Sequence, residues 1–245
     1  MSTVITHIYN EEALLPLWLE HHSKYFDNGI IIDFASTDRS REIISEYPKF
    51  KVYDSTIDMW GVNALDAMMT KFEEDVVGVR IVLNATEFLL GDPNTAERDF
   101  LIPSVSLINM PFDKEFDWSK QFWEQRKHGI SFEQDFSYRR SRILAQTLPN
   151  YPLGRHFESI DAGGYLIVHV ASCLVDDSMI KRKLQFQNKI PQEDKNLNLA
   201  FQHYRHGREF VKEDVLEEQE LFRSRSVDVS QLINDALAFE NNRVA

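Results

Sequence analysis

A short polar stretch interrupts an apolar run near the end of the first third of the chain. The segment RIVLNATEFLLGDP, residues 80–93, places Asn84, Thr86 and Glu87 directly after a run of apolar residues. Ligands bind beyond the carboxyl ends of strands in an open α/β sheet, so these oxygen-bearing side chains lie where they could contact a ligand. Taken alone, Asn and Thr at such a position are more often cap or turn residues.

Polar residues also follow two other predicted strands. The β-branched run that begins the chain stops at Asn10 and Glu12, and the next apolar run contains Asp33. Ligands bind beyond the carboxyl ends of the strands in an open α/β sheet, so these residues are predicted to share one rim with residues 84–87. Taken alone, each is more often a cap or turn residue, and Asn10 is a candidate N-cap with two glutamates in the first turn of the following helix.

Strand and helix patterns alternate through the first 83 residues. This alternation predicts a parallel sheet covered by helices on both faces. A further strand and a basic helix are predicted in the second half, and the tail from residue 209 is acidic with apolar residues at helical spacing. The expected strands are 3–9, 29–34, 51–53, 76–83 and 165–171, and the expected helices are 14–26, 43–47, 60–72 and 178–187.

Composition limits the class of protein. The 245 residues are 43% hydrophobic and 12% aromatic, which suits one large domain, predicted at 1–208, with a helical extension at 209–245. A net charge of -12 argues against nucleic acid as a partner. No apolar run approaches the roughly 20 residues of a membrane span, and Cys173 is a lone cysteine, so a soluble cytoplasmic protein is expected.

Three ordered motifs carry a family resemblance. The stretch VITHIYNEEALLPLWLEHHSKYFDNGIIIDFASTDRS matches the pattern NE…LP.WL.HH…D…D..STD.S, WGVNALDAMM matches a segment carrying an Asn, and RIVLNATEFL aligns with a stretch that ends D-x-D-E-F. Together they make the first 90 residues resemble family 2-type glycosyltransferases with the GT-A fold. Beyond Leu90 the resemblance is looser. It implies an α/β protein with a Rossmann-like, mainly parallel sheet flanked by helices and a helical C-terminal tail.

The resemblance also implies a nucleotide-sugar donor and assigns roles to residues. Asn63 would lie near the diphosphate, and Asn84 and Thr86 stand where relatives carry the two D-x-D carboxylates that hold Mn²⁺ or Mg²⁺. With both carboxylates replaced, three alternatives remain: a weak or dispensable metal at Glu87 and His169, a diphosphate stabilised by cationic side chains, or lost catalysis. The residues implied to contact the base and ribose are Thr6, Tyr9, Asn10, Glu12 and Asp33.

Inverting transfer needs a base that removes the proton of the acceptor hydroxyl. Asp161, Glu158 and His156 are the candidates, in that order, in the loop after a Pro-Leu-Gly turn. The alternative, that all three are ordinary polar residues of a loop, fits the sequence equally well. An arginine of the charged run 131–142 is a candidate counter-charge for the diphosphate, against the alternative of a solvated helix face. His169 is either a metal ligand or a core histidine of its strand.

The sequence therefore predicts an inverting glycosyltransferase of polysaccharide biosynthesis, which moves a sugar from a nucleotide-diphosphate donor to a glycan or lipid-linked acceptor. The alternative is a non-catalytic GT-A-like domain that binds a nucleotide-sugar or a partner. The basic helix at 178–187 would cover the nucleotide site, touch anionic lipid at a membrane surface, or have no partner. The tail would pack on the core or form a contact in a homo-oligomer.

Overall fold

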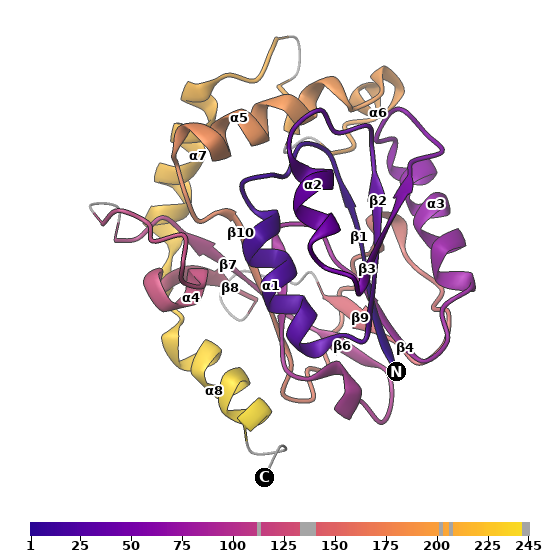
Figure 1. Cartoon of the computed structure of the whole chain (residues 1–245). Coiled ribbons are helices and arrows are strands. Elements are labelled where there is room, and N and C mark those ends of the chain that lie inside the picture. The colour runs from indigo at the N-terminus through magenta and orange to yellow at the C-terminus, as the bar shows by residue number, and fades with distance from the viewer. Residues whose placement is uncertain (112–113, 133–140, 201–202, 206–207, 242–245) are drawn as a thin grey trace.

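A computed structural model describes the chain at residues 1–111, 114–132, 141–200, 203–205 and 208–241 (Figure 1). Its strands are β1 Ser2–Ile8, β2 Asn28–Asp33, β3 Phe50–Asp54, β4 Val79–Val82, β5 Glu87–Leu90, β6 Phe100–Ile102, β7 Ser104–Ile108, β8 His128–Ser131, β9 Arg142–Leu144, β10 Leu166–Ser172 and β11 Val227–Asp228. Its helices are α1 Leu15–Tyr25, α2 Ser40–Ser45, α3 Val62–Glu74, α4 Phe122–Gln125, α5 Asp177–Gln185, α6 Gln192–Asn196, α7 Lys212–Arg225 and α8 Ser230–Asn241, with 3-10 turns η1 Pro93–Thr95, η3 Leu153–Arg155 and η4 Phe186–Asn188.

The first third of the chain forms a parallel sheet between helices. Its four strands lie in the order β3-β2-β1-β4, and every pairing is parallel. Along β1, Val4 and Ile8 pack into the core under α1, whereas Ile5 faces the other side with Met68 and Met69 of α3. Both faces are therefore buried, which explains the nearly continuous apolar runs and confirms the predicted α/β class.

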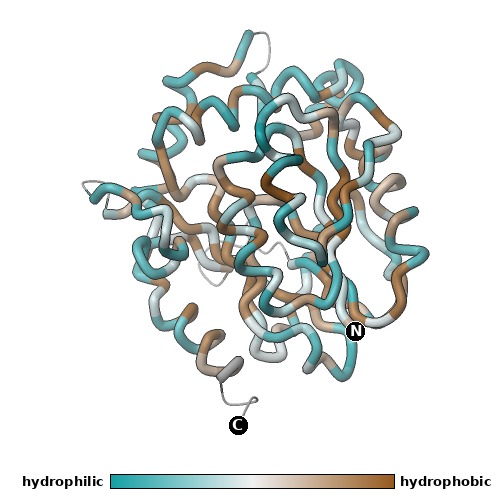
Figure 2. The backbone as a smooth tube through the Cα atoms, viewed as in Figure 1, coloured by the Kyte–Doolittle hydropathy of each residue, from teal (hydrophilic) through white to brown (hydrophobic). Residues whose placement is uncertain are grey.

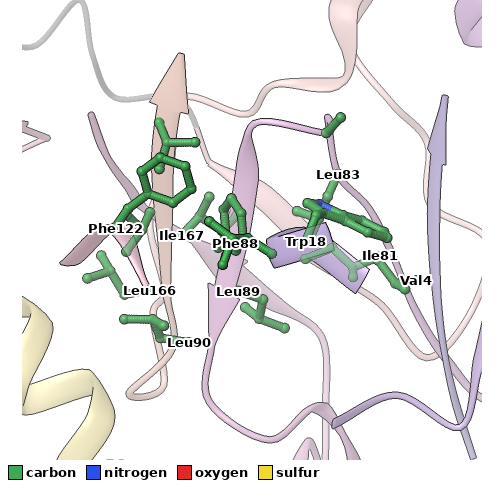
Figure 3. Packing of buried hydrophobic residues seen from close by; sticks show 14 of the residues in the cluster. Val4, Trp18, Ile81, Leu83, Phe88, Leu89, Leu90, Phe122, Leu166 and Ile167 are labelled. Carbon is green, nitrogen blue, oxygen red and sulfur yellow. The ribbon is translucent and has the colours of Figure 1, made fainter. Parts of the chain in front are cut away.

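The chain then forms a second sheet, which is mixed and which the sequence did not predict. Its strands lie in the order β11-β8-β7-β10-β5, with β10 antiparallel to β5 and parallel to β7. Figure 3 shows Trp18 of α1 beside Ile81 and Leu83, with Phe88 of β5 on the same side of the core. Trp18 Nε1 donates to the backbone oxygen of Glu87 at 3.0 Å, so helix α1 fixes the position of the polar stretch at 84–87.

Helix α1 begins at Leu15, close to the expected range 14–26 but later than a cap at Asn10 implies. Its N-cap is Leu14, and Asn10 has a φ of 53°, in the left-handed region that asparagine tolerates. No acidic residue lies in its first turn, and Pro16 occupies a position there where a missing N–H costs nothing. The predictions of an Asn10 cap and of two glutamates in the first turn are wrong. Asn10 Oδ1 instead accepts the backbone N–H of Thr37 at 2.7 Å.

The C-terminal tail is helical, as predicted, and packs on the rest of the chain. Ile233 and Ala236 of α8 belong to the main core, and Val215 of α7 packs with Ile180 of α5. Figure 2 shows hydrophobic residues concentrated on the central strands and hydrophilic ones on the outer helices. None of the helices within the described ranges is long and apolar enough to cross a membrane.

Candidate functional site

Three parallel strands end at one edge of the first sheet, which we call the carboxyl edge. Tyr9 and Asn10 follow β1, Asp33 ends β2, and Asn84 lies just after β4. The registers Ile8↔Asp33 and Ile5↔Val82 bring these strand ends side by side. The fold therefore gathers most of the polar residues that the sequence placed on one rim.

The side chains at this edge already have protein partners. Asp33 is 1% exposed and accepts the backbone N–H of Ser36 and the Nε–H of Arg41, at 3.1 and 2.5 Å. Asn10 Nδ2 donates to Gln185 Oε1 at 3.3 Å, and Glu12 accepts the backbone N–H of Arg39 at 3.1 Å. These contacts hold the edge in one conformation before any ligand arrives.

Two of the residues expected at the nucleotide differ in accessibility. Thr6 is fully buried within β1, with its hydroxyl directed to the backbone oxygen of His7 at 3.4 Å. Asn63 is exposed at the start of α3. Asn63 is therefore accessible to solvent, whereas Thr6 is enclosed within the strand.

The polar stretch at 84–87 contains a buried ion pair. Glu87 accepts from Arg142 Nε at 3.1 and 3.2 Å and from Arg142 Nη2 at 3.0 Å, and both side chains are 6% exposed. Glu87 also accepts the backbone N–H of Asn84 at 2.7 Å, while Thr86 is buried. Strand β9 supplies Arg142 because Ala145, just after its end, bridges Arg80 of β4.

The structure describes only part of the charged run 131–142, which contains Arg142. Glu133, Asp135, Arg139 and Arg140 lie outside the described residues. Arg142 itself lies in a strand and is 5% exposed, so the alternative of a solvated helix face is wrong for this residue. Glu87 neutralises the charge of Arg142, so the main role of this guanidinium in the structure is to pair with that carboxylate.

The donors at 84–87 do not fit a divalent cation as they stand. Glu87 lies directly opposite His169 in the pairing of β5 with β10, so the two suggested ligands are neighbours. However, both oxygens of Glu87 face a guanidinium, and His169 Nδ1 lies 3.3 Å from Ser106 Oγ. Across the ranges that the structure describes, no group of three His, Cys, Asp or Glu side chains could hold a metal ion.

The three candidate bases occupy different surroundings. Asp161 is exposed and paired with Arg98, at a bridge to Leu101 of β6, and this pair lowers the pKa of the Asp161 carboxyl. Glu158 is exposed in the loop, and His156 is partly buried. Arg142 Nη1 donates to the backbone oxygen of Arg155 at 3.4 Å, so the segment that carries His156 lies against the Glu87–Arg142 pair.

Helix α5 and the turn after it cover the carboxyl edge, above the strand ends in Figure 1. Arg182 binds the buried Glu11 through two hydrogen bonds of 2.5 and 2.6 Å, and Gln185 Nε2 donates to the backbone oxygens of Tyr9 and Asn10. Lys189 Nζ lies 4.2 Å from the centre of the Tyr9 ring. This covering segment, residues 182–189, includes the end of the helix that the sequence singled out as basic.

An aromatic cluster lies beneath the covering segment. Trp60 contacts His7 at 5.1 Å, Phe34 at 5.5 Å and Phe186 at 4.6 Å between ring centres, and Phe186 contacts His203 at 5.6 Å. Burial lowers the pKa of His7 to about 4 and that of His203 to about 3. Sequence patterns did not reveal this cluster, because its members come from five separate segments.

Comparison with known proteins finds weak similarities and no strong one. No protein-family model matches the chain, and no curated protein sequence matches it significantly. The mannosyltransferase PcManGT from Pyrobaculum calidifontis, solved in complex with GDP-Man and Mn²⁺, is 13% identical over 98% of this chain and 73% of that chain, with a TM-score of 0.40. A nucleoside-diphosphate-sugar pyrophosphorylase from Vibrio cholerae RC9 is 9% identical over 97% and 100% of the two chains, with a TM-score of 0.30. Similarities of this size assign no ligand or activity to the chain.

Proposed function

We propose that the chain binds a nucleoside-diphosphate sugar at the carboxyl edge and transfers the sugar to a glycan or lipid-linked acceptor. The observation that carries this proposal is the convergence of Tyr9, Asn10 and Asp33 at the strand ends, beneath the cationic residues Arg182 and Lys189. Parallel α/β sheets bind nucleotides at this edge. The motifs of the first 90 residues, which resemble family 2-type glycosyltransferases, support the same ligand.

Each group at the edge has a task in this proposal. Asp33 accepts hydrogen bonds from the base or ribose, and the Tyr9 ring packs against the nucleoside. Lys189 binds the diphosphate oxygens, and Arg182 joins it once the ligand displaces the pair that Arg182 makes with Glu11, because guanidinium and ammonium groups bind phosphate oxygens strongly. No step is assigned to a metal ion, since Glu87 is already engaged by Arg142.

Transfer would proceed with inversion at the sugar. The acceptor oxygen forms a bond to the anomeric carbon while the bond from that carbon to the diphosphate oxygen breaks, and the acceptor proton passes to a base. Among the three candidates, His156 is favoured over Asp161 and Glu158, because its segment lies against Arg142 whereas Asp161 is paired with Arg98.

A second function is favoured by one specific observation. The two positions of the D-x-D carboxylates hold Asn84 and Thr86, and the remaining Glu87 is neutralised by a buried arginine. A domain that keeps the nucleotide pocket but lacks the charges of a metal site suits binding without transfer. The two functions share the carboxyl edge and differ in whether sugar leaves the nucleotide.

A thermal-shift panel of uridine, guanosine and thymidine diphosphate-sugars tests the shared pocket. At a ligand concentration of about 100 Kd the native state gains about 2.7 kcal/mol, which raises the Tm by about 5–10 °C for a chain of this size. Calorimetry on Asp33→Asn should then show at least a tenfold loss of affinity, and Glu42→Gln, at an exposed pair on α2, serves as the matched control. Unchanged affinity in Asp33→Asn would remove this pocket from the proposal.

Release of free nucleoside diphosphate in the presence of acceptor glycans separates the two functions. Transfer predicts turnover that falls about 10²–10⁴-fold in His156→Gln, the usual contribution of a general base. Binding without turnover across the panel would select the non-catalytic domain.

A further inference from the structure

A pocket away from the carboxyl edge is lined by residues of helices α1, α4 and α8 and of the segments next to them. Figure 1 shows where these three helices lie. The cavity of about 320 Å³ falls at the lower end of the range typical of small-molecule sites. We call it the α8 pocket, because the C-terminal helix forms one wall. Its lining residues are His21, Lys24, Tyr25, Gln121, Trp123, Glu124, Lys127, Asn234 and Leu237.

One lining group is a histidine whose tautomer is fixed. His21 Nε2 lies 2.6 Å from the backbone oxygen of Leu89, and a carbonyl oxygen can only accept, so Nε2 carries the hydrogen. Burial lowers the pKa of His21 to about 4, which keeps the ring neutral near pH 7. Nδ1 is therefore a bare acceptor, and no donor within the described ranges reaches it.

A second unsatisfied acceptor lines the same pocket. Gln121 Oε1 is a buried atom with no hydrogen-bond partner among the described residues. Buried oxygens of this kind are normally paired, because leaving one unpaired costs free energy. Together with the exposed carboxylate of Glu124, the lining presents three acceptors beside the donors of Lys24, Lys127 and Asn234, so a fitting ligand offers both donors and acceptors.

The lining charges argue against an ionic ligand. Lys24 Nζ pairs with Glu20 at 3.1 Å, and Lys127 Nζ donates to the backbone oxygen of Trp123 at 2.6 Å. An anion would meet Glu124 and the two bare acceptors, whereas a cation would meet both lysines. A neutral ligand rich in hydroxyl groups avoids both conflicts.

Aromatic rings supply the apolar part of the lining. His21 contacts Tyr25 and Trp123, each at 5.2 Å between ring centres, and Leu237 of α8 lies at the same pocket. The lining as a whole is mainly polar, which suits a ligand rich in hydroxyl groups. The C–H faces of a sugar ring suit these aromatic rings while its hydroxyls donate to the acceptors.

We propose that the α8 pocket binds a neutral saccharide, a monosaccharide or the end unit of a glycan, through hydroxyl hydrogens donated to His21 Nδ1 and, after rotation of the Gln121 side chain, to its Oε1. The site is separate from the carboxyl edge, so the inference does not depend on the proposed function. It gives the chain a place to hold a glycan whether or not the chain transfers sugar.

The test is saturation-transfer NMR of the full chain with glucose, mannose, galactose and N-acetylglucosamine, followed by titration. The expected Kd is on the order of 1 mM, typical of a weakly bound small ligand. Asn234→Trp, at an exposed residue of α8 that lines the pocket, should weaken binding at least tenfold by filling it. Gln121→Met should weaken binding by removing one acceptor.

Asp235→Trp is the matched control, since Asp235 is exposed on the same helix but does not line the pocket, and it should leave binding unchanged. The proposal is overturned if no saccharide binds, if the Asn234→Trp variant binds the saccharide with the same Kd as the unchanged protein, or if a nucleoside diphosphate displaces the saccharide. Preference for acetate or tetramethylammonium over all four sugars would also overturn it. Displacement by a nucleoside diphosphate would also argue against the carboxyl edge as the nucleotide site, whereas the other outcomes leave nucleotide binding there untouched, and that binding is measured separately.

Discussion

The carboxyl edge and the α8 pocket hold similar chemical groups in opposite states. At the edge, Glu11 is bound by Arg182, Asp33 by Arg41 and Asn10 by Gln185. In the pocket, His21 Nδ1 and Gln121 Oε1 have no partner within the described ranges. At the edge the carboxylates and the Asn10 amide are thus engaged by protein groups, although His7 Nδ1 and Trp60 Nε1 next to them have no partner within the described ranges, whereas in the pocket the acceptors themselves are unpaired.

This difference predicts two ways of binding. A nucleotide at the edge must displace contacts of the covering segment, so part of its interaction energy is used to open the site. A saccharide in the α8 pocket enters a cavity that already exists and gains hydrogen bonds without losing any. Variants of the covering segment should therefore change nucleotide affinity and leave saccharide affinity alone.

The largest effect is expected from breaking the buried pair between Glu11 and Arg182. Arg182→Met leaves the Glu11 carboxylate buried without its partner, which should lower the free energy of unfolding by about 3–5 kcal/mol. Urea denaturation followed by circular dichroism measures this loss. The double variant Glu11→Gln with Arg182→Met should lose less, because no buried charge remains.

Arg39→Met, at an exposed pair with Glu42, is the matched control and should show no measurable change in urea midpoint. A loss below about 1 kcal/mol in Arg182→Met would mean that the pair adds little to stability, as exposed pairs do. The edge would then be open in solution, and the contrast with the α8 pocket would disappear.

A second effect comes from the buried histidines of both regions, which are His7 and His203 at the edge, and His21 with its neighbour His22 at the pocket. Burial lowers the pKa of His7 at the edge and of His21 in the pocket to about 4, from an ordinary value near 6.5. Arg142 and Arg182 lower the pKa of His7 further, against the opposing charge of Glu87. The folded state therefore binds protons less readily than the unfolded state at both positions.

Stability should consequently be complete above about pH 6.5 and fall as the pH drops toward 4, by up to ~3 kcal/mol for each histidine. Measurement of the unfolding free energy from pH 7.5 to 4.5 tests this dependence. His7→Asn should remove the part of the pH dependence that is due to His7 and leave the part that is due to His21. A profile that stays flat down to pH 4.5 would contradict the burial of both rings.

The smallest effect is expected from removing metal ions. Because Asn84 and Thr86 are neutral and Glu87 is held by Arg142, chelation should change nucleotide affinity by less than a factor of ten, about 1.4 kcal/mol or less. Calorimetry with and without chelator measures the change. The double variant Asn84→Asp with Thr86→Asp should make nucleotide affinity depend more strongly on Mn²⁺. If chelator instead abolishes nucleotide binding by the wild-type protein, Glu87 and His169 would be a sufficient metal site.

The sequence predicted the first sheet because its signals are local. Apolar runs alternate with helical spacing through residue 83, and the registers of β1 with β2 and β4 follow from buried faces. The start of α1 was missed because Asn10 owes its positive φ to partners 26 and 27 residues away, Ser36 and Thr37. Local capping preferences carry no information about such contacts.

The small two-stranded sheet of β6 and β9 and the closure of the edge depend on still longer separations. Strands β6 and β9 have three residues each and are held by pairing with each other and with the end of β4, so no periodicity marks them. Glu11 and Arg182 are 171 residues apart. The sequence identified the polar strand ends and the basic helix as separate features, but only the fold shows that one covers the other.

Hydrogen–deuterium exchange with and without nucleoside diphosphate tests the central claim most directly, because it observes both regions in one experiment. Binding at the carboxyl edge predicts slower exchange in residues 7–12 and 33–40, a changed rate in the covering segment at 182–189, and no change at 21–25 or 121–127, which line the α8 pocket. Protection at the α8 pocket with none at the strand ends would contradict the assignment of the nucleotide to the carboxyl edge.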